Sequence, residues 1–147
     1  MKVAVACDHG GFDIKPEIIA HLESKGYEVV DCGTYSPEST DYPIWGEKAA
    51  RMVAAGECDF GVLFCGTGFG ISLSANKVRG IRAVVCSEPY TARLSRQHNN
   101  ANMVSFGARV VGIEMAKMIL DEFFAAEFMG GRHQRRVDLM MAIEDKN

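Results

Sequence analysis

The sequence predicts an α/β fold, namely a doubly wound, Rossmann-like parallel sheet of about five strands within a three-layer α/β/α sandwich. Short apolar runs that are typical of buried strands alternate along the chain with amphipathic stretches that are typical of helices. This alternation is the pattern of βαβ units, which cover both faces of a parallel sheet with helices. The sequence has no internal repeat and no Pro/Gly/Ser-rich linker, so we expect one domain that spans residues 1–147.

The expected elements follow one another in regular order along the chain. Strands are expected at residues 2–7, 27–32, 59–65, 81–86 and 102–106. Helices are expected at residues 12–25, 44–55, 89–97, 113–128 and 132–144, with a further short helix that runs from a glycine-rich turn at 66–70 to residue 76. Gly26 and Gly56 end the first two helices in the way that C-cap glycines do.

Composition excludes several classes of function. The net charge of −3 and the pI near 5.8 argue against a nucleic-acid-binding domain, which usually carries a basic face. No apolar run approaches the ~20 residues that span a bilayer, and the first residues lack the apolar core of a signal peptide. The five cysteines form neither a CxxC pair nor a zinc-ligand spacing, so we expect reduced thiols, no metal site and a cytoplasmic location.

Two polar, glycine-rich turns mark the expected ligand site. In doubly wound sheets, ligands bind beyond the carboxyl ends of the strands where the winding reverses, most often between strands one and three. The turns at that point are 7–11, which holds Asp8 and His9, and 65–70, which begins with Cys65. A lone Asp at a strand end is often a helix N-cap and a lone His is often structural, but their place opposite a cysteine and a glycine turn favours a site.

The turn at 65–70 is suited to holding an anion. Gly66, Gly68 and Gly70 can adopt positive φ, so consecutive N–H groups can converge on a phosphate or on an oxyanion formed during a reaction. The turn is neither a P-loop nor a dinucleotide fingerprint, because no Lys-Ser/Thr follows it and the glycine spacing differs. Cys65 closes a buried strand just before a helix, where a thiolate can act as nucleophile or base. The other four cysteines are interpreted as small buried hydrophobes.

Segments along nearly the whole chain resemble the ribose-5-phosphate isomerase B family, which includes galactose-6-phosphate and allose-6-phosphate isomerases. The matching segments are CDHGGF at 7–12, DYP at 41–43, GECDFGVLFCGTGFGISLSANKVRGIRA at 56–83, ARLSRQHNNANM at 92–103, FGARVVG at 106–112 and FMGGRHQRRV at 128–137. The CGTGxG segment followed by ANK is highly specific. The resemblance implies an aldose–ketose isomerisation of the pentose phosphate pathway, which passes through an enediolate without a metal or an organic cofactor.

The resemblance also implies roles for individual residues. Cys65 matches the family's catalytic base, and the glutamate that some members place six residues beyond is Ile71 here, which cannot titrate. His98 matches the acid/base that opens the furanose ring, a task that suits imidazole. The oxyanion pocket matches Gly66, Thr67, Gly68, Phe69 and Gly70; the substrate contacts match Asp8, His9 and Asn99; and the phosphate-binding positions match Arg109, Arg132 and Arg136.

Topology adds an expectation about assembly. His98 follows a helix and precedes the fifth strand, so it should lie at the amino ends of the sheet, whereas Cys65 lies at the carboxyl ends. We therefore expect a composite active site at a homodimer interface, with the helix at 132–144 packing there, and leave open whether dimers pair into tetramers. Two alternatives to a ribose 5-phosphate isomerase stay open: a hexose-phosphate isomerase, for example of allose 6-phosphate, and a non-catalytic phosphate-sensing module.

Overall fold

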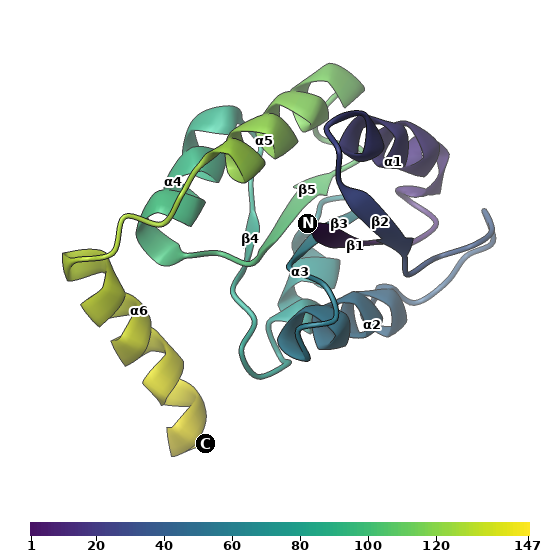
Figure 1. Ribbon diagram of the computed structural model, residues 1–147. Coiled ribbons are helices and arrows are strands. Elements are labelled where there is room, and N and C mark those ends of the chain that lie inside the picture. The colour runs from purple at the N-terminus through teal and green to yellow at the C-terminus, as the bar shows by residue number, and fades with distance from the viewer.

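The computed structural model describes residues 1–147, and its five strands form one parallel sheet in the order β2-β1-β3-β5-β4 (Figure 1). The strands are β1 (Lys2–Cys7), β2 (Glu28–Asp31), β3 (Phe60–Cys65), β4 (Ala83–Val85) and β5 (Met103–Gly107). The α-helices are α1 (Lys15–Ser24), α2 (Tyr42–Ala54), α3 (Phe69–Ala75), α4 (Pro89–Asn99), α5 (Ile113–Ala125) and α6 (Arg132–Met141). Two 3₁₀ helices are present, η1 (Phe12–Ile14) and η2 (Ala142–Lys146). The predicted fold class is confirmed.

Several predicted boundaries are wrong at element ends. The predicted helix at 12–25 begins as the 3₁₀ helix η1, and the predicted helix at 132–144 turns into the 3₁₀ helix η2 after Met141. The helix predicted to reach residue 128 ends at Ala125, because Ala126 adopts an extended conformation. The strand predicted at 81–86 is reduced to β4, since the N–H of Arg82 donates to the side-chain oxygen of Asn102 instead of joining the ladder.

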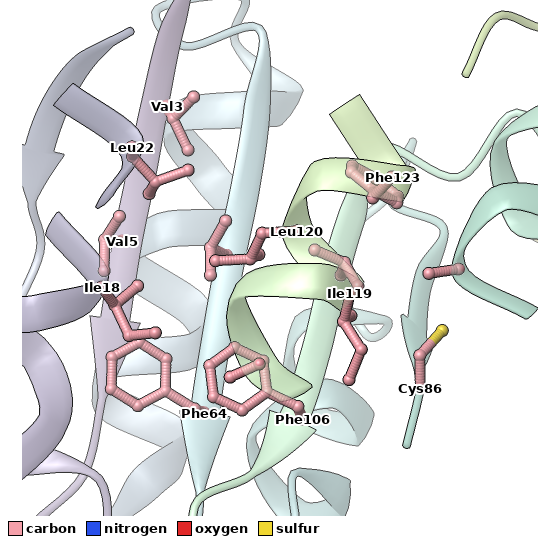
Figure 2. Packing of buried hydrophobic residues seen from close by; sticks show 14 of the residues in the cluster. Val3, Val5, Ile18, Leu22, Phe64, Cys86, Phe106, Ile119, Leu120 and Phe123 are labelled. Atoms are coloured by element: carbon pink, nitrogen blue, oxygen red, sulfur yellow. The ribbon is translucent and has the colours of Figure 1, made fainter. Parts of the chain in front are cut away.

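Each face of the sheet carries its own apolar cluster. On one face, strand residues such as Val3 and Val5 pack with α1, α4 and α5, and the stacked rings of Phe64 and Phe106 lie 5.1 Å apart (Figure 2). On the other face, the alternate residues Ala4 and Ala6 pack with α2 and α3. Figure 1 shows these two helical layers on opposite sides of the sheet. The alternation follows from the period of two along a strand, whose successive side chains point to opposite faces.

The order of the strands places a winding reversal between β1 and β3. Strand β1 lies between β2 and β3, so the chain leaves it first toward one edge of the sheet and later toward the other. The carboxyl ends of β1 and β3 therefore lie side by side, with Cys7 in register with Phe64. These are the ends from which both polar turns emerge, as the sequence predicts.

Helix α6 projects away from the sheet at the C-terminal end of the chain (Figure 1). Within it only His133 and Val137 are buried, whereas Leu139 and Met140 are exposed. None of the helices of the structure combines the length and apolar character needed to cross a membrane.

Candidate active site

Cys65 is the last residue of strand β3, and the turn that follows it requires a glycine at position 68. The Cys65 side chain is buried, and the N–H of Gly68 donates a hydrogen bond to its Sγ at 3.2 Å. The sulfur therefore lies against a backbone donor of the glycine turn. Gly68 has φ +81°, and a Cβ placed on it would lie 2.7 Å from the carbonyl carbon of Phe106. Both the backbone conformation and the close approach to β5 therefore require glycine at this position.

Two backbone donors next to the thiol are available to a ligand. The N–H groups of Gly66 and Thr67 have no acceptor within the chain, whereas the next two N–H groups bond to Cys65 Sγ and to Thr67 Oγ1. Free N–H groups beside a nucleophile or base are the usual elements of an oxyanion pocket. The turn can therefore stabilise a negative oxygen within reach of the thiol.

The first polar turn and Arg109 lie against the same glycine turn. Asp8 is buried, and its Oδ1 accepts a hydrogen bond from the N–H of Gly10 at 2.8 Å rather than capping the following helix. A Cβ on Gly10 would lie 3.1 Å from the Gly66 nitrogen, and one on Gly66 would lie 3.4 Å from Arg109 Nη1. We call the predicted residues of these two turns, together with Arg109, the thiol cluster; it consists of Asp8, His9, Cys65, Gly66, Thr67, Gly68, Phe69, Gly70 and Arg109.

A second group of predicted residues gathers around two stacked imidazole rings. The rings of His98 and His133 lie 4.3 Å apart with an interplanar angle of 7°. Burial lowers the pKa of His133, and the neighbouring His98, Arg132 and Arg136 lower this pKa further, so His133 is neutral near pH 7. We call this group the histidine cluster; it consists of His98, Arg132, His133 and Arg136. The predicted substrate contact Asn99 follows His98 at the end of α4 and lines a neighbouring pocket with Met140 and Met141.

The two clusters lie at opposite ends of the sheet. Residue Gly107 at the carboxyl end of β5 is in register with Cys65, whereas Met103 at its amino end follows closely after His98 and α4. At ~3.3 Å per residue, β5 alone separates these ends by about 13 Å. The structure therefore brings the predicted residues together in two groups rather than in one.

The four other cysteines are poor candidates for a thiolate. Burial raises the pKa of Cys7 to about 12 and that of Cys32 to about 11. Burial also raises the pKa values of Cys58 and Cys86. These four side chains remain protonated near neutral pH. No group of three or more His, Cys, Asp or Glu side chains is arranged to hold a metal ion.

Iodoacetamide is expected to modify Cys65 faster than any other cysteine of the native protein near neutral pH. The Cys65 sulfur accepts a hydrogen bond from the Gly68 N–H in the glycine turn, whereas burial raises the pKa values of the other four thiols and keeps them protonated. Mass spectrometry of proteolytic peptides measures the rate for each thiol, and the urea-unfolded protein, in which all five cysteines should react, is the control. Equal rates at Cys65 and Cys86 in the native protein would contradict the assignment.

Sequence reasoning assigned no role to two residues that shape these clusters. The Tyr42 ring covers Gly70, since a Cβ on that glycine would lie 2.5 Å from ring carbons. His133 is buried one helical turn before Val137, so helical periodicity could have placed both residues on the packed face of α6. The contacts of Tyr42 with Gly70 and of His133 with His98 join residues that are far apart in the sequence, so they could not be predicted from residue spacing.

Comparisons with known proteins point to one family. A family model described as Ribose/Galactose Isomerase matches residues 3–140. The Ribose-5-phosphate isomerase B of Escherichia coli is 59% identical over 145 residues, which cover 99% of this chain and 97% of that protein. A Ribose-5-Phosphate Isomerase B structure from Clostridium thermocellum matches with TM-score 0.98 and 53% identity over 99% of both chains. A Mycoplasma genitalium Ribose-5-phosphate Isomerase B structure with bound Ribulose-5-phosphate matches with TM-score 0.94 and 38% identity, covering 99% of this chain and 97% of that one.

Proposed function

The chain belongs to the ribose/galactose isomerase family, and from this membership we propose that it interconverts ribose 5-phosphate and ribulose 5-phosphate. It is an enzyme, an aldose–ketose isomerase of the ribose-5-phosphate isomerase B type. The observation that carries the proposed chemistry is the thiol of Cys65, which lies beside two backbone N–H groups that have no acceptor in the chain. A base and an oxyanion pocket side by side are what proton abstraction next to a carbonyl requires.

The proposed proton transfer uses the thiol cluster. In the open-chain aldose, the Cys65 thiolate removes the proton from C2, and the electron pair of that bond forms a C1–C2 double bond while the carbonyl oxygen on C1 becomes negative. The N–H groups of Gly66 and Thr67 stabilise that oxygen. The thiol then returns the proton to C1, and the hydroxyl proton of C2 passes to the oxygen on C1, which leaves a ketone at C2. No oxidant or reductant is consumed, and no metal or organic cofactor takes part in the proposed steps.

We propose that His98 of the partner subunit opens the furanose ring. The separation of the two clusters supports this, because His98 lies at the amino ends of the strands and Cys65 at the carboxyl ends of the same chain. A second copy of the chain can bring its histidine cluster to the thiol cluster of the first. Arg109 from one subunit and Arg132 and Arg136 from the other would then surround the substrate phosphate.

The C-terminal helical segment, which consists of α6 and η2, supports a homodimer. Leu139 and Met140 on α6 and Ile143 on η2 are exposed, and such side chains favour contact with another protein surface. We therefore propose one isomerase domain over residues 1–147, with its C-terminal helical segment at the dimer interface. A cytoplasmic enzyme of the pentose phosphate pathway fits this proposal, and pairing of dimers into tetramers stays open.

Turnover of ribose 5-phosphate and of allose 6-phosphate by the purified, metal-stripped protein tests the proposed substrate. We expect faster formation of the ketose from ribose 5-phosphate, with no loss of rate when a chelator is present. A preference for allose 6-phosphate would contradict the pentose assignment but would be consistent with the proposed proton transfer. Binding of both compounds without turnover of either would contradict the isomerase and favour a phosphate-sensing module.

A further inference from the structure

The loop that joins β2 to α2 ends in a hydrogen bond to His9. The backbone N–H of Thr40 donates to Nδ1 of the His9 ring at 3.1 Å. A backbone amide nitrogen can only donate, so Nδ1 must present its lone pair to it. The neutral imidazole then carries its single proton on Nε2, since one ring nitrogen is a donor and the other an acceptor. The loop therefore selects one of the two tautomers of His9.

Thr40 is itself held in place by helix α2. The indole Nε1 of Trp45 donates to Thr40 Oγ1 at 3.0 Å. The indole ring is packed against Gly33, where an added Cβ would lie 2.4 Å from a ring carbon. This close packing restrains the indole ring, and the hydrogen bond from its N–H holds the Thr40 side chain, so Thr40 is positioned beside His9.

The other end of the loop is anchored by a buried cation. Lys15 is buried, and its ammonium group pairs with Asp31 at 2.9 Å and also donates to the backbone oxygen of Thr34. The hydroxyl of Tyr35 donates to the backbone oxygen of Asp31 at 3.0 Å. The segment that carries Thr40 is thus attached to the sheet on one side and to α2 on the other, so it can hold the His9 ring in one orientation.

The Nε2 atom of His9 is left free for a ligand. The ring has no other hydrogen bond within the chain, and its side chain is exposed just beyond the carboxyl end of β1. From this geometry we infer that Thr40 and Trp45 are positioning residues that fix His9 as the Nε2–H tautomer, so that His9 donates a hydrogen bond to an oxygen of the sugar phosphate. The inference rests on the proposed function for the identity of that oxygen-rich ligand, but the tautomer itself is a property of the free protein.

The ¹⁵N chemical shifts of the His9 ring nitrogens test the tautomer directly without substrate. The chain has only four histidines, so the His9 signals can be identified by their loss in His9→Gln. Near neutral pH we expect Nδ1 to resonate as an unprotonated nitrogen and Nε2 as a protonated one. Thr40→Val removes the oxygen that accepts from Trp45, and Trp45→Phe removes that donor, so both should shift the two signals toward the averaged values of free histidine.

Tyr35→Phe is the matched control for these two variants. It removes the two hydrogen bonds of the Tyr35 hydroxyl, to the Asp31 backbone oxygen and from Lys48. It keeps the Tyr35 ring beside Trp45 and changes neither Thr40 nor His9, so the tautomer should not change. A proton on Nδ1 in the unmodified protein would overturn the inference. So would shifts that are unchanged in both Thr40→Val and Trp45→Phe. The chemical shifts are measured without substrate, so they test the tautomer even if the protein does not isomerise ribose 5-phosphate.

Kinetics with ribose 5-phosphate test whether the fixed donor contacts the substrate. Loss of one hydrogen bond corresponds to about a three- to tenfold change in binding, so we expect KM to rise by that factor in Thr40→Val with little change in kcat. His9→Gln, whose amide N–H reaches about as far as Nε2, should retain more affinity than the shorter His9→Asn. Equal KM values for these two His9 variants would overturn the assignment of Nε2–H as the donor.

Discussion

Cys65→Ala is expected to lower kcat for ribose 5-phosphate by about a thousandfold, within the range of ~10²–10⁴ that a general base contributes. The substitution removes the only thiol that combines a stabilising N–H contact with adjacent free backbone donors. The substitution leaves in place the arginines that we propose bind the phosphate, so KM should change little. A coupled assay of ribulose 5-phosphate formation measures both constants.

Cys86→Ala is the matched control for this loss. Cys86 is a buried cysteine that directly follows strand β4 at the same end of the sheet, and burial raises its pKa. Its replacement removes the same sulfur from a similar environment, so stability should fall to a comparable extent while kcat is retained. Substantial turnover by Cys65→Ala in a folded protein would contradict the thiolate mechanism.

A mixture of two inactive variants is expected to recover activity if the site is shared between subunits. Cys65→Ala and His98→Ala should each lose turnover of the ring-closed substrate by about 10²–10⁴. When the two chains are co-expressed in equal amounts, about half of the dimers contain one of each, and one of the two sites in such a dimer has both residues intact. The mixture should therefore show about a quarter of the unmodified activity.

The double variant Cys65→Ala/His98→Ala supplies the control for this experiment. Mixed dimers of the double variant with the unmodified chain contain no complete site if sites are shared, so equal co-expression should leave about a quarter of the activity. If each site lies within one chain, the same mixture should retain about half, and the two single variants should stay inactive together. That second pattern would contradict the composite site.

Local patterns account for most of the fold. Alternating apolar runs and helical stretches predict every strand and α-helix of the sheet and its layers, because secondary structure follows the periodicity of side chains. The predictions fail at element ends, where a single tertiary contact can override periodicity. The bond between Arg82 and Asn102, for example, joins residues 20 apart and shortens the edge strand.

The candidate site also combines features that the sequence predicts with features that depend on tertiary packing. The glycine turn, the cysteine at its start and the two ends of the sheet to which Cys65 and His98 belong can be predicted from the sequence, since they depend on the order of the elements alone. The contacts between side chains from different elements, in contrast, depend on how these elements pack. The Thr40 N–H reaches His9 across 31 positions, and the His98 ring stacks on His133 from another helix. Neither contact can be predicted from the spacing of the residues in the sequence. The distance between the residues of each pair is set by how the elements that carry them pack against one another.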